Sequence, residues 1–405
     1  MPHIPPYQPT RRHAAAITAI LALLSIFPPL ATDMYLPAIG TIANALHTSH
    51  AATELSLSLF FLGLCVGQVI MGPMIDSFGR KAPLMAGTAL YALCSALLPL
   101  VRDVVLFDAL RFFQAIGACA GMVVGRAVVN DLYDGQRAAK AMTVLVMLMT
   151  VGPIISPTLG SLLLQGFGWQ SIFVVMLAVG IVALVLSAAV IPETLPPAAR
   201  LRNPMRSAAR TAGGLLRRRD YAVPVLVAGL VQGGMFAFIT GSSGVFQGEF
   251  GLDSLAYGLT FAVIAAALFL FGQLNHRLLD HFTAARILGA GLPLYVLAGA
   301  LLALASGTGS LWLLVVPLWL SIGMVGLLSA NAMAITMAAA REGAGTGSAL
   351  LGTVQFGMAF TVSACVALGG SDSALPMSLG ILIPALLAWA LWSGGRRRQA
   401  APSAP

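Results

Sequence analysis

Residues 72–81 read GPMIDSFGRK and separate an apolar run at about 52–75 from a second one at 82–101. A helix needs roughly 20 mainly apolar residues to cross the hydrocarbon core of a bilayer, and both runs are of that size. The stretch between them is short, contains two glycines and ends in adjacent basic residues. It therefore predicts a tight reversal between two membrane-spanning helices.

The whole chain has the composition of a membrane protein. Of its 405 residues, 58% are hydrophobic and only 9% are charged, and the mean hydropathy is +0.90. Soluble proteins carry about 25% charged residues. There is more apolar side chain than one globular core can bury, so lipid is expected to solvate much of the surface. The four cysteines have no paired spacing, which argues against a disulfide framework or a metal site.

Lysine and arginine gather in short clusters between the apolar runs. The clusters lie at residues 11–12, 80–81, 137–140, 200–219, 277–286, 341 and 396–398. Five of the six intervals between them contain no basic residue, and each interval has room for two spans. The formal net charge of +8 therefore reflects membrane topology better than nucleic-acid binding. By the positive-inside rule, the clusters and both termini face the cytoplasm.

The apolar runs predict twelve spans. Their approximate limits are 14–40, 52–75, 82–101, 104–129, 138–164, 169–191, 221–246, 255–279, 285–305, 310–334, 343–368 and 374–392. No small-residue cleavage site follows the first run, so we expect an uncleaved span rather than a signal peptide.

The chain divides near its midpoint, at the basic, proline-containing segment 192–220. We expect an all-α membrane protein with twelve transmembrane helices in two pseudo-symmetric six-helix bundles, an architecture common among transporters. The predicted parts are a cytoplasmic N-terminus (1–13), an N-terminal bundle (14–191), a cytoplasmic linker (192–220), a C-terminal bundle (221–392) and a cytoplasmic tail (393–405). A shift of 205 residues places Lys81 on Arg286, which favours an internal duplication.

Four segments resemble motifs of one transporter family. Residues 72–81 are similar to the G-x-x-x-D-x-x-G-R-[KR] signature of the major facilitator superfamily. The others are TDMYLPA at 32–38, RFFQAIG at 111–117, and the segment from Gly152-Pro153 through Pro157 to Gly160. These resemble the drug/proton antiporters of the Bcr/CflA multidrug-resistance subfamily. The resemblance implies the fold of that superfamily, export in exchange for protons, and no cofactor besides the proton as coupling ion.

Asp33 is the candidate proton carrier. It lies about eight residues from the outer end of the first span, where a carboxylate is costly unless it faces water or a partner. A carboxylate so placed can bind a proton from outside and release it inside. The alternative interpretation is that Asp33 caps a helix break after Pro28 and Pro29.

Arg111 lies about eight residues into the fourth span and needs an acceptor there. Gln114 follows one helical turn later on the same face. The resemblance implies that both residues line the central cavity and influence the proton site. The alternatives are a structural anchor between helices and a local pair with Asp108, one turn earlier.

A second group is expected to form a cytoplasmic gate: Gly72, Asp76, Gly79, Arg80, Lys81 and Asp131. The glycines permit a tight reversal. We expect Asp76 to accept hydrogen bonds from a helix N-terminus, and Arg80 to reach a carboxylate across the interface, with Asp131 as the candidate partner. Such contacts would hold the outward-facing state and break as the halves rock. The alternative is a purely topogenic role.

Gly152, Pro153, Pro157 and Gly160 form the candidate antiporter motif in the fifth span. Proline removes a backbone donor, and glycine removes side-chain bulk. Together they favour a kinked, closely packed helix that resists leak and supports exchange. The alternative is the proline content that is ordinary in membrane helices.

Spans seven to twelve contain no carboxylate well inside the membrane, so proton chemistry is expected in the first half. The candidate substrate cavity is lined by Tyr35, Gln232, Phe236, Phe238, Asn331 and Gln355. A mostly apolar cavity with few polar groups suits varied hydrophobic compounds.

The sequence thus favours a proton-coupled antiporter that exports small, largely hydrophobic drugs by alternating access. Three alternatives stay open. The first two are an exporter of a metabolite or amino acid on the same scaffold, and an integral-membrane enzyme, which would need a metal cluster or a nucleophile–base pair. A receptor or scaffold is a third. We expect a monomeric, multi-pass protein of a bacterial inner membrane, a secondary transporter rather than an enzyme. Its partners would be a small-molecule substrate and membrane lipids, with no nucleic acid and no metal.

Overall fold

A computed structural model describes residues 11–133, 135–200, 204–340, 344–370 and 373–400. Every regular element within these residues is helical, and twelve of the helices are long and apolar enough to cross a membrane. This confirms the predicted all-α, twelve-span fold. Residues 1–10, 201–203 and 401–405, which belong to the predicted N-terminus, linker and tail, lie outside the described part.

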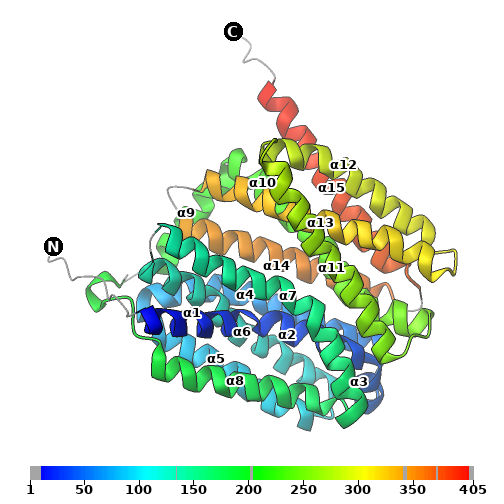
Figure 1. Cartoon of the computed structure of the whole chain (residues 1–405), viewed down its shortest axis with the longest axis horizontal. Coiled ribbons are helices and arrows are strands. Elements are labelled where there is room, and N and C mark those ends of the chain that lie inside the picture. Colours follow the sequence, from blue (N-terminus) through cyan, green and yellow to red (C-terminus); the bar gives the residue numbers. More distant parts are fainter. Residues whose placement is uncertain (1–10, 134, 201–203, 341–343, 371–372, 401–405) are drawn as a thin grey trace.

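The chain forms two groups of helices (Figure 1). The first group, here the N-terminal half, contains α1 (Arg11–Ser25), α2 (Phe27–Asp33), η1 (Leu36–Ala38), α3 (Ile39–Ala45), α4 (His50–Phe78), α5 (Lys81–Leu97), η2 (Leu98–Leu100), α6 (Val104–Leu132), α7 (Gly135–Phe167) and α8 (Gln170–Val190). The second, the C-terminal half, contains α10 (Arg219–Ser243), the π-helix η4 (Gly244–Glu249), α11 (Ser254–Leu279), α12 (Ala284–Ala305), α13 (Leu311–Ala339), α14 (Ala344–Leu368) and α15 (Leu375–Ala400). Between them, within the predicted linker, lie η3 (Pro197–Ala199) and α9 (Pro204–Arg217).

Consecutive spans run in alternating directions, so every second loop lies at the same end of the molecule. We call the end that carries the arginine-rich loops the basic end, and the other the opposite end. Residues 79–81 and 193–200 meet at the basic end, where Glu193 contacts both Arg80 and Arg200.

The first span is broken and extends beyond its expected limits of 14–40. It runs over Arg12–Ala45 as α1, α2, η1 and α3. Pro28 and Pro29 lie in the first turn of α2, where a missing backbone N–H is tolerated. The second interruption follows Asp33, at the turn before Pro37 of η1. Asp33 therefore sits at the end of a short helix, inside the bundle.

Other limits differ by smaller amounts. The fifth span was expected over 138–164, and α7 covers Gly135–Phe167. The last span was expected to end at residue 392, but α15 continues to Ala400. The arginines that follow residue 392 are good helix formers, so the helix continues through them into the predicted tail.

Two pairs of helices join the halves. α4 packs along α14, and α7 packs along α11. These are spans two with eleven and five with eight. Moving each span by six positions exchanges the two pairs, which is the relation that a pseudo-two-fold axis between the halves requires.

Close helix packing inside the N-terminal half depends on small residues. A Cβ atom at Gly63 of α4 would lie 2.8 Å from Cβ of Ala115 on α6, and one at Gly67 would lie 2.7 Å from Cβ of Cys119. Contacts this short exclude any side chain. Membrane helices associate largely through such packing, because lipid is as apolar as the helix surface.

Substitution Gly63→Leu is therefore expected to destabilise the protein, because overpacking costs ~1–3 kcal/mol. Gly272→Leu on α11 is the matched control, since a Cβ there meets no atom within 4 Å. The measurement is the melting temperature and the monodisperse fraction in detergent, by size-exclusion chromatography. Equal behaviour of the two variants would contradict the packing role of Gly63.

Candidate functional site

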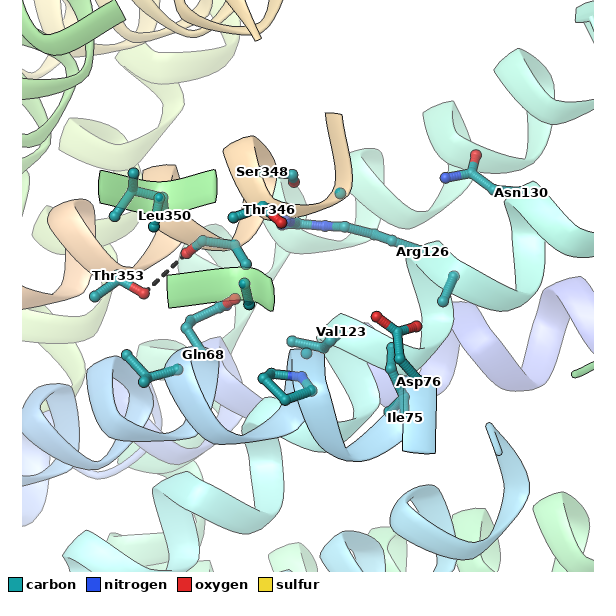
Figure 2. Close-up of a pocket in the computed structure, with 18 of the residues that line it drawn as sticks. Gln68, Ile75, Asp76, Val123, Arg126, Asn130, Thr346, Ser348, Leu350 and Thr353 are labelled. Carbon is teal, nitrogen blue, oxygen red and sulfur yellow. Dashed lines mark hydrogen bonds between the residues drawn. The ribbon is translucent and has the colours of Figure 1, made fainter. Parts of the chain in front are cut away.

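A cavity of about 680 Å³ lies between the halves at the basic end (Figure 2). Its walls come from α4, α6, α7, α9, α13 and α14, and most of its lining is apolar. Four charged side chains face it: Asp76, Arg80, Arg126 and Asp131. The cavity separates the two halves at this end and is the natural place for a substrate.

The halves touch at the opposite end. The hydroxyls of Ser58 and Ser363 share a hydrogen bond of 2.7 Å, joining α4 to α14. Ser161 Oγ of α7 donates to the carbonyl of Ser254 at 2.6 Å. Nearer the middle, the rings of Phe61 and Phe236 pack at 4.4 Å between centroids. The structure is therefore closed at the opposite end.

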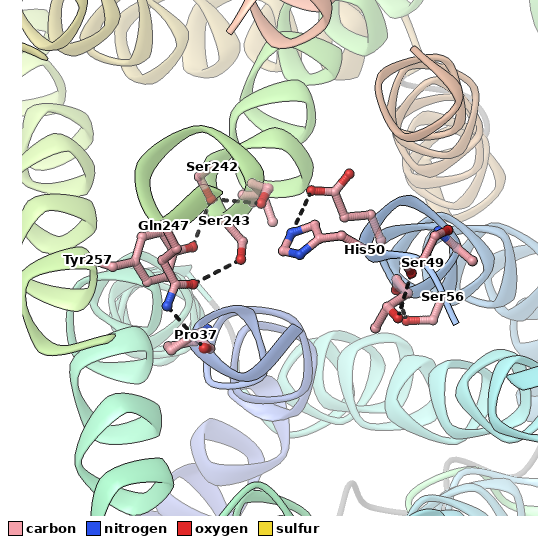
Figure 3. A network of polar contacts seen from close by, with 12 residues as sticks. Pro37, Ser49, His50, Ser56, Ser242, Ser243, Gln247 and Tyr257 are labelled. Atoms are coloured by element: carbon pink, nitrogen blue, oxygen red, sulfur yellow. Dashed lines mark hydrogen bonds and ion pairs between the residues drawn. The ribbon is translucent and has the colours of Figure 1, made fainter. Parts of the chain in front are cut away.

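A polar network covers this closed end (Figure 3). Gln247 of η4 donates through Nε2 to the carbonyl of Pro37 at 3.3 Å, and accepts from Ser243 Oγ at 2.9 Å. Ser242 and Tyr257 share a hydrogen bond of 2.8 Å. The break in the first span thus provides a backbone acceptor to the other half.

At the basic end, Arg80 holds two carboxylates. Its Nη1 donates to Asp76 Oδ1 at 2.7 Å and its Nε to Asp131 Oδ2 at 3.0 Å. Burial works to lower the pKa of the Arg80 guanidinium, but these hydrogen bonds and negative charges outweigh it and raise that pKa above its ordinary value. Asp131 is the expected partner. All three residues belong to the N-terminal half, however, so the expected contact across the interface does not occur here.

Two further expectations for this group need correction. The acceptor at the N-terminus of α5 is Glu193 instead of Asp76: its carboxylate accepts from the backbone N–H of Arg80 at 2.8 Å and of Lys81 at 3.2 Å. Gly79, with φ of +90°, ends α4 and makes room for this carboxylate. Gly72 lies inside α4 and faces the cavity, so it takes no part in the reversal.

Sequence reasoning passed over Glu193 because it lies far along the chain. Its signal was its position: it directly follows the sixth span, and so returns to the end where residues 79–81 lie.

Arg111 is fully buried in α6. Its Nη1 donates to Gln114 Oε1 at 2.7 Å, and its Nη2 donates to the carbonyl of Ala31 in α2 at 2.9 Å. The guanidinium also lies over the rings of Tyr35 and Phe60, at 4.7 and 4.6 Å. Neither Arg111 nor Gln114 lines the cavity. In this conformation Arg111 anchors α6 to the broken first span.

Asp33 is 1% exposed at the end of α2. Its Oδ1 accepts a hydrogen bond of 2.8 Å from Thr32 Oγ1, and within the described residues it makes no ion pair with Arg111 or any other cation. Four residues further along the chain, the carbonyl of Pro37 accepts a hydrogen bond from Gln247 of the C-terminal half. The Asp33 carboxylate is thus buried on the broken first span, without a counter-charge among the described residues.

A second buried carboxylate, Glu54 of α4, was missed by sequence reasoning. It is 1% exposed and lies 3.4 Å from Nε2 of His50, one helical turn earlier. His50 is partly exposed and lines a small cavity of about 270 Å³ at the opposite end, beside Gln247. The available signal was an acidic residue inside an apolar run, four residues after a histidine.

The candidate antiporter motif on α7 packs against the broken first span. A Cβ at Gly152 would lie 2.9 Å from Pro29, and one at Gly160 would collide with the carbonyl of Met34. Pro153 and Pro157 lie within one continuous helix. α7 is therefore held between the segment that carries Asp33 and α11 of the C-terminal half.

None of the six residues predicted to line the substrate cavity lies on the cavity at the basic end. They are Tyr35, Gln232, Phe236, Phe238, Asn331 and Gln355. Several are instead engaged between helices. Tyr35 bonds Ser56, Asn331 bonds Asn275 at 2.6 Å, and Phe236 packs on Phe61 of the other half.

Comparison with known proteins places the chain in a family. The model of the Major Facilitator Superfamily matches residues 21–363. The chain belongs to the Major Facilitator Superfamily. Members are secondary transporters of small molecules, so this is a multi-pass membrane transporter and not an enzyme, as the sequence predicted.

Two relatives in this superfamily span most of the chain. An uncharacterized MFS-type transporter, YdgK of Bacillus subtilis, is 30% identical over 387 residues, which are 94% of this chain and 95% of YdgK. A bicyclomycin resistance protein homolog of Haemophilus influenzae is 30% identical and covers 88% of this chain and 90% of its own. The crystal structure of a D-xylose–proton symporter matches with a TM-score of 0.73 over 93% of this chain and 97% of its own, at 14% identity.

Arg111→Lys is expected to lower the melting temperature by several degrees. A lysine cannot reach Gln114 and the Ala31 carbonyl with a planar fork, and each charge-assisted hydrogen bond lost costs about 1.5–3 kcal/mol. The matched control is Arg137→Lys at the exposed start of α7. Unfolding followed by tryptophan fluorescence in detergent measures both. An Arg111→Lys protein as stable as the control would show that these contacts contribute little.

Proposed function

We propose that the protein exports small, largely hydrophobic molecules from the cytoplasm in exchange for protons. In this proposal the basic end faces the cytoplasm, with both termini, and the opposite end faces outward. The protein acts as a monomer in a bacterial inner membrane, within the Bcr/CflA subfamily.

One observation carries the proposal: Asp33, a buried carboxylate with no counter-charge among the described residues, lies four residues before the Pro37 contact at the closed end, while a mostly apolar cavity lies between the halves at the basic end. An ionised carboxylate is costly to bury unpaired. Asp33 therefore needs a proton whenever the opposite end is closed around it. An apolar cavity at the cytoplasmic end takes substrate from the cell.

The proposed cycle follows from these two features. When the opposite end is open, Asp33 exchanges protons with the outside. A bound proton neutralises Asp33, and the halves can then close over it, which separates them at the basic end. Loss of the proton toward the cytoplasm and entry of substrate favour the reverse movement, which delivers the substrate outside.

The names of relatives support export of toxic compounds. The homolog in Haemophilus influenzae is named for bicyclomycin resistance. The mostly apolar wall of the cavity is consistent with hydrophobic compounds that vary in shape.

Asp33→Asn is expected to abolish proton-driven export while leaving insertion and folding intact, because asparagine keeps the hydrogen bond from Thr32 but cannot carry a proton. The assay expresses each variant in an efflux-deficient bacterium. Accumulation of a panel of hydrophobic compounds is then compared with and without a protonophore. The control is Asp253→Asn, which preserves the exposed cap of α11. Export by Asp33→Asn at the wild-type rate would refute this role.

Glu54 and His50 are expected to supply Asp33 with protons from the outward side. Glu54→Gln and His50→Asn should slow export several-fold when the outside is mildly alkaline and protons are scarce, and have little effect when it is mildly acidic. The readout is the initial rate of proton-driven transport in proteoliposomes at several outside pH values. His47→Asn, at an exposed position nearby, is the control. A rate reduced equally at every pH would indicate a structural role only.

A further inference from the structure

Arg126 of α6 faces the cavity and, among the described residues, is the charged group there that no other side chain holds. Arg80 is committed to Asp76 and Asp131. For Arg126, no hydrogen bond or ion pair with any other described residue occurs. Figure 2 shows its side chain pointing away from Asp76 and toward the segment of α14 that carries Thr346 and Ser348. A guanidinium without a partner is costly to hold in a largely apolar cavity unless a ligand with an acceptor group occupies the cavity.

Gln68 of α4 is a second donor without a partner on the same cavity. Its side chain is only 2% exposed, and within the described residues its Nε2 makes no hydrogen bond. The amide rests on α14: a Cβ at Gly352 would lie 2.9 Å from its Cδ. Glycine at that position therefore leaves space for the Gln68 amide. Two uncommitted donors, one charged and one neutral, line one cavity.

The rest of the cavity lining limits which molecules Arg126 and Gln68 can bind. Apolar side chains from several helices, among them Val123, Met142, Met337 and Leu350, form most of the wall. A guanidinium presents parallel N–H donors that match a carboxylate or a phosphate. Gln68 places a further unpartnered amide donor on the lining of the same cavity. The combination suits a molecule with an apolar body and one anionic group.

We propose that the cavity binds an amphipathic organic anion, whose carboxylate or similar group is held by Arg126 and Gln68. This rests on the proposed function and names the substrate class for the same cavity. The apolar body packs against the wall, and the anionic group is the part that the protein recognises by charge.

The cluster around Arg80 favours a single anionic group. Two carboxylates, Asp76 and Asp131, share one guanidinium, so the cluster keeps a net negative charge. It lies on the same cavity and repels a second anionic group. A monoanion oriented with its charge toward Arg126 avoids this repulsion, whereas a dianion does not.

The test is direct binding to purified protein in phosphatidylcholine nanodiscs, which contain no anionic lipid to compete. The probes are naphthylacetate and its neutral, nearly isosteric partner naphthylacetamide, measured by equilibrium dialysis against empty nanodiscs. We expect the wild type to bind the acid at least about tenfold more tightly than the amide, the effect of one charge-assisted hydrogen bond. Arg126→Gln should abolish this preference and leave binding of the amide unchanged. Gln68→Ala should reduce it several-fold.

A control variant and a variant that tests a competing explanation complete the design. Arg137→Gln removes the same charge from an exposed site off the cavity, and should keep the preference. Glu342, outside the described residues, is the carboxylate nearest in sequence to the α14 part of the cavity. If Glu342→Gln abolishes the preference as Arg126→Gln does, the inference is overturned in favour of an ion pair that shapes the cavity.

Equal binding of acid and amide by the wild type also overturns the inference. It would leave proton-driven export untouched, because binding is measured without a proton gradient. Conversely, a preference for the acid that depends on Arg126, in a protein that exports nothing, would refute the proposed function and retain the binding site.

Discussion

The hydrogen bond from Arg111 to the carbonyl of Ala31 determines how the N-terminal half is assembled. A guanidinium inside a lipid-embedded bundle needs acceptors, and the first span provides one where α2 is short and followed by a break. Gln114 accepts a second hydrogen bond from the guanidinium, and the aromatic faces of Tyr35 and Phe60 lie against its charge. This contact holds α6 against the segment that ends in Asp33. The position of the candidate proton carrier therefore depends on an arginine that does not touch it.

The buried ionic groups fall into two classes by how their charge is satisfied. Arg111 and Arg80 each donate to acceptors on more than one segment and serve to connect helices, although the buried Nε of Arg111 has no partner among the described residues. Within the described part of the chain, Asp33 and Glu54 pair with no permanently charged cation, since the contact of Glu54 with His50 is ionic only when the histidine is protonated. Groups of the second class are costly in a fixed charge state. They are the ones whose state can change with conformation, which is what a proton-coupled carrier requires.

Sequence patterns could predict the spans and the basic end, because long apolar runs and clustered arginines depend on the bilayer alone. The contact between Arg80 and Asp131 could also be predicted, since both residues lie where helices end at the same end of the molecule. The residues that line the cavity could not be predicted. Lipid is as apolar as a helix interface, so the helices carry almost no periodic pattern to indicate which face meets the other half. Residues such as Phe236 and Asn331 were chosen by type, and the structure places them between helices. Glu54 was missed because its depth depends on where α4 begins.

The charged groups also separate the two tasks of the proposed carrier. Asp33 and Glu54 lie toward the opposite end and do not line the cavity, and the carboxylates that do line it, Asp76 and Asp131, are held by Arg80. Substrate and proton therefore do not compete for one carboxylate in this arrangement. Coupling between proton and substrate therefore requires helices that extend from the region of Asp33 and Glu54 to the cavity.

Two helices have this property. α4 carries Glu54 near one end and Gln68 on the cavity, while α7 contacts Met34 through Gly160 and lines the cavity with Met142. Each also packs against the other half, along α14 and α11. A movement that opens the interface around the carboxylates must shift the same helices that form the cavity wall. A transporter coupled in this way can accept substrates whose apolar parts differ in shape, because the substrate need only contact the cavity wall formed by the moving helices. The charge of Arg126 then restricts which molecules remain bound there.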